Sequence, residues 1–142
     1  MDDVIWNIHA LVTFALFGVI WTVQLLVYPQ FQEVSASRWN GYHDNHMRRI
    51  TWVVGPLMLL EVASLFLLFL NGLLETSVLS LWVFGVGPLG LIWGVTGGVS
   101  VPLHGGLSIH HDPQSIARLI QTNWLRTLGW TLRGGWVFQV SM

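Results

Sequence analysis

Residues 50–70 have the sequence ITWVVGPLMLLEVASLFLLFL, and this stretch decides the fold class. Its length matches the ~20 residues that an α-helix needs to cross a bilayer, and Glu61 is its only ionisable side chain. Inside hydrocarbon, a single segment satisfies its backbone hydrogen bonds only as a helix. Three further apolar stretches have similar lengths. We therefore predict an all-α integral membrane four-helix bundle, one domain over 1–142, with spans at about 4–28, 50–70, 77–101 and 124–140.

The composition supports this class and excludes others. Apolar residues make up 53% of the chain and charged residues only 9%, whereas a soluble domain carries about 25% charged residues. These figures exclude a soluble enzyme, a disordered segment and a secreted disulfide scaffold. The absence of cysteine excludes disulfides, iron–sulfur clusters and thiolate zinc sites. The net charge of −1 gives no field that attracts nucleic acid, so we expect no nucleic-acid partner.

The connections between the spans predict the topology. Only a few residues join the second and third spans, which predicts an antiparallel hairpin. The connections at about 29–49 and 102–123 are longer, lie on one side of the membrane and are expected to be partly helical. A helix capped by Ser35 or Ser37 is expected to run straight into the second span. Asp112, followed by Pro113, predicts a separate short helix before the fourth span.

The arginines orient the chain. Four of them lie in the two long connections, whereas the opposite side carries acidic residues near the N-terminus and at Glu75. Positively charged loops stay in the cytoplasm, so both termini are predicted on the outer, periplasmic side of the cell inner membrane. The first apolar run follows an acidic start, and we expect it to be retained rather than cleaved as a signal peptide.

Three ionisable residues fall at membrane depth: Glu61, Arg126 and Arg133. An unpaired charge at this depth is costly, so each is a candidate functional residue. About 16 Å of helix separates Ile50 from Glu61, and about 15 Å separates Asn123 from Arg133. Both spans enter from the cytoplasmic side, so Glu61 and Arg133 are predicted to form a pair near the midplane, directly or through water. The alternative is that the pair only fixes helix register.

Three of the predicted spans each carry a polar stripe at helical spacing. The stripes comprise His9, Thr13 and Gln24 with Tyr28 nearby, then His43, His46, Glu61 and Ser64, and finally Asn123, Arg126, Trp130 and Arg133. Stripes on separate helices are satisfied together if all of them face inward. We predict a polar intramembrane cavity that is deepest at Glu61 and Arg133 and opens toward the cytoplasm. A network of inter-helix hydrogen bonds without a cavity is the alternative.

The histidines raise two cofactor alternatives, although we primarily expect no cofactor. His43 and His46 stand at i and i+3 on a helix, and this spacing can bring both imidazoles to one metal ion. The chain has neither an HExxH motif nor the paired ExxH motifs of di-iron bundles, so no metal site is predicted beyond this alternative. His9, in the outer part of the first span, would be an axial ligand if the protein held a haem.

Two blocks of sequence resemble a known family. One is YPQF at 28–31 followed by YHDNHMRRITWVVGPLMLLE at 42–61, and the other is VPLHGGL at 101–107 followed by TNWLRTLGWTLRGG at 122–135. The second block resembles the proline–polar–leucine and tryptophan–arginine pattern of the anthrone-oxygenase-like family. These are small four-helix membrane proteins, some of which are linked to the oxidation of polycyclic anthrones. The resemblance implies a site at His104, Trp124, Arg126 and Arg133, with His104 standing where the family more often has asparagine.

A second resemblance concerns the first span alone. The stretch IHALVTFALFGVIW at 8–21 is similar to the opening of the membrane protoporphyrinogen oxidases, which hold haem through a histidine in that helix. His9 would be the matching residue. The later arginine and lysine motifs of that family are missing from this chain.

These observations predict a membrane protein that binds, and in one version oxidises, a lipophilic aromatic or quinone-like small molecule. Arg126 and Arg133 would stabilise an oxyanion, and His104 or Glu61 would move the proton. The predicted ligand-binding residues are His43, His46, Gln24, Tyr28, Asn123, Trp124 and Trp130, the last stacking on the ring. Besides lipid and this ligand, other membrane subunits are candidate partners. The alternative functions are a non-catalytic subunit of a larger membrane complex and a haem-binding membrane protein.

Overall fold

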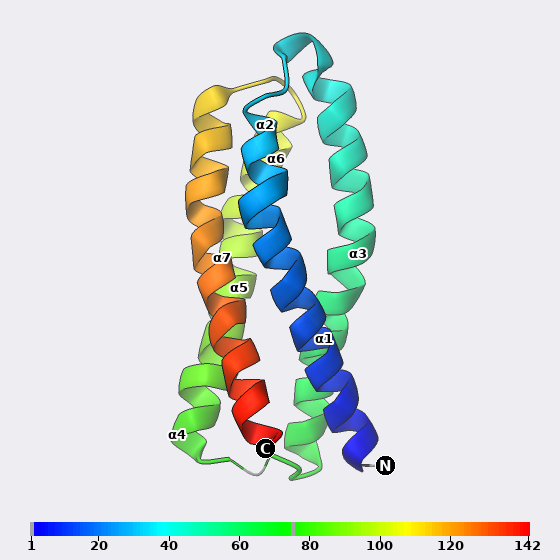
Figure 1. Cartoon of the computed structure of the whole chain (residues 1–142), viewed down its shortest axis with the longest axis vertical. Coiled ribbons are helices and arrows are strands. Elements are labelled where there is room, and N and C mark those ends of the chain that lie inside the picture. Colours follow the sequence, from blue (N-terminus) through cyan, green and yellow to red (C-terminus); the bar gives the residue numbers. More distant parts are fainter. Residues whose placement is uncertain (1, 75) are drawn as a thin grey trace.

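The computed structural model describes residues 2–74 and 76–142, and every element within them is helical. Glu75, one of the acidic residues on the side predicted to be periplasmic, lies outside this range. Four long helical stretches lie side by side, and both chain ends are at the same end of the molecule (Figure 1). The first stretch consists of α1 (Asp2–Thr22), the π-helical turn η1 (Val23–Val27) and α2 (Tyr28–Phe31), and the second is α3 (Ala36–Leu70). The third stretch consists of α4 (Val78–Ser80), the π-helical turn η2 (Leu81–Val86), α5 (Gly87–Val95), the π-helical turn η3 (Thr96–Ser100) and α6 (Val101–Leu107). The fourth stretch is α7 (Pro113–Val140).

Three of the four stretches are long and apolar enough to cross a membrane: Asp3–Phe31, Ala36–Leu70 and Val78–Leu107. The exception is α7, although it is long enough. Its packing explains its polarity, because α7 contacts both α1 and α5 and buries polar residues such as Asn123 and Arg126. Polar side chains on the packed face of a helix are kept away from lipid, and the outer face of α7 exposes apolar residues such as Leu125 and Leu128.

The three π-helical turns, η1, η2 and η3, explain how helices pass through prolines. Each turn ends two residues before a proline, namely Pro29, Pro88 and Pro102. Proline lacks a backbone N–H and its ring clashes with the carbonyl four residues earlier, so a wider turn relieves both problems. The helices continue past Pro29 and Pro102, where the predicted spans stop, and end at Phe31 and Leu107.

The two long connections are largely helical. The predicted helix that runs into the second span is confirmed, since α3 is continuous from Ala36 after an extended Ser35. The predicted cap at Asp112 is also confirmed: its carboxylate accepts hydrogen bonds from the backbone N–H groups of Gln114 (3.2 Å) and Ser115 (3.0 Å). The short helix expected after it is instead the first part of α7, which continues to Val140 without a break.

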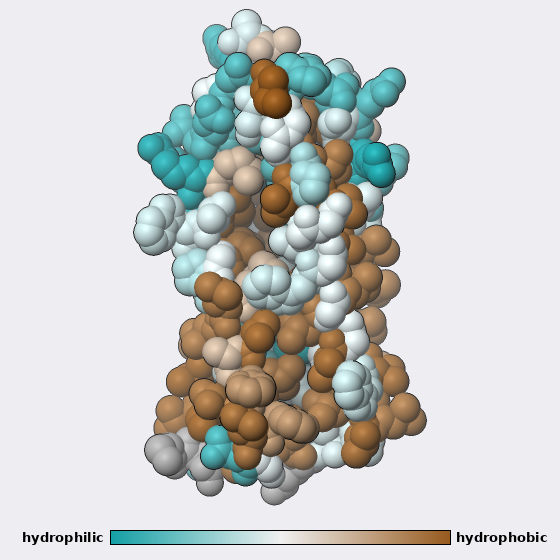
Figure 2. Space-filling view, turned by 180° about the vertical axis from the view of Figure 1, so that it is seen from behind, coloured by the Kyte–Doolittle hydropathy of each residue, from teal (hydrophilic) through white to brown (hydrophobic). Residues whose placement is uncertain are grey.

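The helices pack in the order α3, α1, α7 and the third stretch. Within the described residues, α3 packs extensively only on α1, and the third stretch packs on α7. The seam between α3 and the third stretch is thus the loosest of the four. At the end opposite the termini, an aromatic and aliphatic cluster closes the molecule around Phe31, Trp39 and Leu107, all fully buried. On the face seen in Figure 2, hydrophilic residues gather at this end and hydrophobic residues cover much of the opposite half.

Candidate functional site

The pair predicted from matching depths is present and direct. Arg133 Nε lies 2.8 Å from Glu61 Oε1, and both side chains are completely buried. Glu61 also accepts from Thr13 Oγ1 at 3.2 Å and from Trp130 Nε1 at 3.2 Å, while Arg133 donates to the carbonyl of Gly85. Four helical stretches therefore meet at one charged layer. All of the strong acceptor and donor sites of the pair are occupied, which is the arrangement that a buried pair requires.

His9 belongs to the same layer. Its Nδ1 lies 2.9 Å from Ser64 Oγ, and its Nε2 lies 3.4 Å from Arg133 Nη2. Ser64 in turn donates to the carbonyl of Glu61 at 3.1 Å. Both ring nitrogens of this fully buried histidine are engaged, so His9 has no free nitrogen for a haem iron. The residues at this position do not fit the haem that the second resemblance implied.

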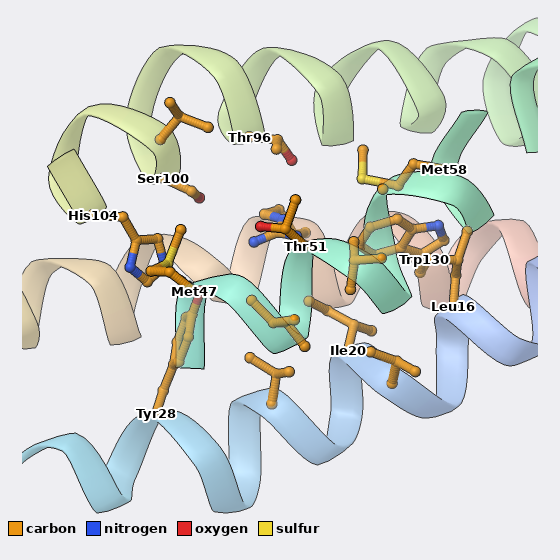
Figure 3. Close-up of a pocket in the computed structure, with 17 residues that line it drawn as sticks. Leu16, Ile20, Tyr28, Met47, Thr51, Met58, Thr96, Ser100, His104 and Trp130 are labelled. Carbon is orange, nitrogen blue, oxygen red and sulfur yellow. Dashed lines mark hydrogen bonds between the residues drawn. The ribbon is translucent and has the colours of Figure 1, made fainter. Parts of the chain in front are cut away.

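A cavity of about 210 Å³ lies between this charged layer and the aromatic cluster. Leu16, Ile20, Met58 and Trp130 form an apolar part, and Figure 3 shows Tyr28, Ser100 and His104 gathered at the other end. The predicted polar cavity centred on Glu61 and Arg133 is wrong, because those two side chains are bonded to each other and to their neighbours and do not line the space. The cavity is instead apolar with a polar end.

The direction in which the cavity opens also differs from the prediction. The cluster around Phe31, Trp39 and Leu107 fills the end opposite the termini, at which the cavity was expected to open. The cavity is lined by α3 on one side and by η3 and α6 on the other, with α1 and α7 behind them. Because α3 does not pack extensively on η3 or α6, the cavity opens along this seam to the surface of the bundle.

Arg126 is the charged residue of the cavity. Its side chain is 6% exposed and its guanidinium lies 5.5 Å from the centre of the Trp130 ring. Nη1 donates to Asn123 Oδ1 at 3.2 Å, but Nε has no hydrogen-bond partner among the described residues. Within those residues the only ion pair is that of Glu61 and Arg133. Arg126 is therefore a buried cation that lacks an anion, which is strongly unfavourable without a compensating group.

A second row of polar side chains holds Arg126 in place. Asn123 Nδ2 donates to Gln24 Oε1 at 2.9 Å, and Thr127 Oγ1 is 3.4 Å from the same oxygen. Gln24 Nε2 donates to the carbonyl of Ile120 at 3.3 Å. Gln24 and Asn123 were predicted to bind the ligand, but neither lines the cavity. Their position behind Arg126 makes them positioning residues for its guanidinium.

A chain of hydrogen bonds leaves the polar end of the cavity. Tyr28 Oη is 3.1 Å from His104 Nε2, and His104 Nδ1 is 3.0 Å from His43 Nε2. His43 Nδ1 is 3.3 Å from Ser108 Oγ. The chain thus joins α2, α6 and α3 and brings together three residues that the sequence analysis selected separately.

Two other predicted site residues lie apart from the cavity. His46 stacks on His104 with ring centres 6.0 Å apart, and its Nε2 has no partner among the described residues. Its predicted partner for metal binding, His43, uses both ring nitrogens in the chain above, and the described residues contain no group of three or more metal-binding side chains. Trp124 is 48% exposed and packs edge-on against Trp21, on the outside of the molecule.

Sequence reasoning selected His104 of the third stretch but missed Thr96 and Ser100. All three line the cavity, and Ser100 Oγ is buried with no hydrogen-bond partner among the described residues. The signal was present in the sequence as polar residues at every fourth position. Two unpartnered polar atoms, Ser100 Oγ and Arg126 Nε, therefore belong to residues that line one cavity.

Comparison of the chain with known protein families, with curated protein sequences and with solved structures gave no match.

Proposed function

We propose that this protein is a multi-pass four-helix bundle of the cell inner membrane that binds a lipophilic aromatic or quinone-like molecule carrying an acidic group. The arginine-rich connections lie at the end opposite both termini, which supports cytoplasmic connections and periplasmic termini. In this arrangement α7 is the fourth span, packed between α1 and the third stretch. Membrane lipid would surround the apolar surface and give the ligand its route to the open seam.

The observation that carries the proposal is the buried guanidinium of Arg126 without an anion. A planar guanidinium recognises carboxylates, phosphates and aromatic oxyanions through charge-assisted hydrogen bonds. The unused Nε of Arg126 and the unused hydroxyl of Ser100 supply two donors for such a group. An acidic ligand would complete both residues, whereas a neutral hydrocarbon would leave them unsatisfied.

The rest of the cavity suits an aromatic body. The apolar walls of Leu16, Ile20 and Met58 lead to the indole of Trp130, whose ring can stack on a ligand. An apolar cavity of about 150 Å³ is enough to hold benzene, and this cavity of about 210 Å³ holds a larger ring system. The half-open seam allows entry from the lipid, where such a molecule is dissolved. Oxidation of the ligand, which the resemblance implies, stays a prediction.

The test compares two probes that differ only in acidity. 2-Hydroxy-1,4-naphthoquinone is an anion at neutral pH, and its methyl ether, 2-methoxy-1,4-naphthoquinone, is neutral. Each is titrated into the purified protein in lipid nanodiscs, with quenching of tryptophan fluorescence as the signal and empty nanodiscs as the background. The wild-type protein should bind the acidic probe more tightly than the ether.

Arg126→Gln should weaken binding of the acidic probe at least tenfold, about 1.4 kcal/mol, and leave binding of the ether unchanged. Arg118→Gln makes the same change at an exposed position of the same helix and should alter neither affinity. If Arg126→Gln unfolds, the same titrations are made with Arg126→Lys, which keeps the positive charge. Equal affinity of the wild type and Arg126→Gln for the acidic probe would refute the proposal. Failure to bind either probe, together with a stoichiometric partner chain in the preparation, would favour the accessory-subunit function.

A further inference from the structure

The hydrogen bonds from Ser108 to Tyr28 can run in one direction only. Ser108 Oγ is 3.1 Å from the carbonyl oxygen of His104, and a carbonyl can only accept, so the serine hydrogen is committed there. Ser108 Oγ must then accept from Nδ1–H of His43. A neutral imidazole that carries its hydrogen on Nδ1 has a lone pair on Nε2. His43 Nε2 therefore accepts a hydrogen bond, and the donor is Nδ1–H of His104.

The same logic fixes the end of the chain. His104, with its hydrogen on Nδ1, accepts at Nε2 from the hydroxyl of Tyr28. Every member is then satisfied with two neutral histidines. The hydrogen of Tyr28 points toward His104, so the oxygen of Tyr28 is left with acceptor capacity on the side that faces the cavity and the guanidinium of Arg126. A ligand hydroxyl at this end would find an acceptor that it shares with Arg126.

The chain is also the polar route through the closed end of the molecule. His43 is fully buried, and Tyr28 and His104 are 3% and 6% exposed, whereas Ser108 lies on the surface. Apolar packing around Trp39 and Leu107 surrounds this route. The cavity itself opens toward lipid, which provides no water to carry a proton. A proton that leaves the cavity for water therefore has this row of side chains to follow.

We propose that Tyr28, His104 and His43 form a proton relay that deprotonates a hydroxyl-bearing ligand in the cavity, a role that rests on the proposed function. The ligand O–H bond breaks and its proton passes to Tyr28 Oη, while the tyrosine proton passes to His104 Nε2. The Nδ1 proton of His104 moves to His43 Nε2, and the Nδ1 proton of His43 leaves through Ser108 to water. No electron is transferred. The ligand remains as an oxyanion beside Arg126, and a proton entering at Ser108 reverses the sequence.

The probe for this relay is 4-nitrophenol, whose protonated and ionised forms absorb at different wavelengths. Its affinity and its ionised fraction are first measured at equilibrium with the protein in nanodiscs. A stopped-flow pH jump then gives the rate at which the bound probe changes its ionisation. The wild-type protein should respond quickly, and the rate should fall in D₂O because protons move in every step.

His43→Gln interrupts the relay at a residue that does not line the cavity. Glutamine can still donate and accept hydrogen bonds, but its amide does not pass a proton on at neutral pH. We expect the ionisation rate to fall at least tenfold, with unchanged affinity and an unchanged equilibrium fraction of bound phenolate. Tyr28→Phe interrupts the relay at its first member and repeats the test if His43→Gln unfolds.

His46→Gln is the matched control. His46 lies one turn further along α3 and stacks on His104, but it makes no hydrogen bond to the relay. The other ionisable groups that face the relay are Asp44, His46 and Arg126, and all of them are retained in His43→Gln. His46→Gln should leave the rate unchanged.

The outcomes separate the two proposals. An unchanged rate in His43→Gln and in Tyr28→Phe would overturn the relay and leave ligand binding at Arg126 in place. Equal slowing by His43→Gln and His46→Gln would also overturn it, because a general disturbance of the histidine cluster would then be the cause. Wild-type protein that does not bind 4-nitrophenol or either naphthoquinone would overturn the proposed function, and the relay with it.

Discussion

A Cβ atom added to Gly129 of α7 would lie 2.7 Å from Cγ1 of Ile92 on α5. Cβ atoms essentially never lie within 3.0 Å of a neighbouring heavy atom, so the close approach of α5 and α7 depends on the absence of a side chain at Gly129. Glycines that let helix backbones approach are typical of helix contacts within membranes. The third stretch and α7 are thereby fixed to each other on the side of the cavity away from α3.

Gly129→Ala should therefore destabilise the protein by about 1–3 kcal/mol, the usual effect of overpacking. The measurement is the thermal unfolding midpoint of the purified protein in detergent. Gly135→Ala is the matched control, because nothing lies within 4 Å of its added methyl group. Alanine is a better helix former than glycine, so Gly135→Ala should be neutral or stabilising. Ile92→Ala should reduce the effect of Gly129→Ala; strictly additive effects would contradict the contact.

The buried pair of Glu61 and Arg133 gives a prediction about stability. Replacing either residue with glutamine leaves the other charge buried and unpaired, which typically costs about 3–5 kcal/mol. Replacing both removes the unpaired charge. The double variant should therefore be more stable than the sum of the two single effects predicts, by a margin that a double-mutant cycle of unfolding midpoints measures. Two small, additive effects would show that the pair does not hold the four helices together.

Filling the cavity provides a prediction that does not depend on Arg126. Gly55 lines the cavity from α3, and nothing lies within 4 Å of a Cβ atom added there. Gly55→Leu should abolish binding of both naphthoquinone probes, the acid and the ether, because the new side chain occupies the apolar space. Gly41→Leu makes the same change on the same helix outside the cavity and should preserve binding. Unchanged affinity in Gly55→Leu would place the probe elsewhere.

The cap of α7 gives a prediction about pH. Hydrogen bonds from Ser115, and less from Gln114, lower the pKa of the Asp112 carboxyl below its ordinary value of 3.8. A lowered pKa means that the stabilisation is present above the ordinary value and is lost as the pH falls through the lowered one. The protection of the Gln114 and Ser115 amides against deuterium exchange, taken relative to the intrinsic exchange rate at each pH, should therefore decrease in acid. Asp112→Asn keeps a capping side chain that does not titrate, so its exchange should lack this acid-dependent component.

The sequence was sufficient for the features that depend on distance along a helix. The pairing of Glu61 with Arg133 followed from equal helix lengths to the same membrane face, because the rise per residue is nearly constant. The helical nature of the chain followed from the apolar stretches, because a segment in hydrocarbon satisfies its own backbone hydrogen bonds only as a helix. Each of these two features depends on a single helix, or on two helices whose lengths are counted from the same face of the membrane.

The cavity could not be predicted in this way. The polar stripes indicated which side chains face inward, but the contacts between helices decide which of these bond to one another and which remain free. Glu61 and Arg133 are fully occupied, whereas Arg126, two turns from Arg133 on α7, keeps an unused donor. The two arginines differ because Glu61 of α3 lies within reach of Arg133 and pairs with it, whereas Arg126 has no such pair among the described residues. The lateral opening depends likewise on which helix pairs pack, and no single span carries that information.

The π-helical turns have a consequence for how the chain tolerates changes in length. Each residue of an α-helix turns the following side chains by about 100°, so positions four apart drift by about 40° around the axis. The wider turn at η3 reduces this drift, and Thr96, Ser100 and His104 reach the cavity at intervals of four. Deleting one residue from η3 would restore an ordinary helix and leave His104 facing Tyr28, because a π-helical turn holds one residue more than an α-helical turn. A one-residue deletion should thus be tolerated within η3, whereas the same deletion within α5 would rotate His104 by about 100° away from Tyr28.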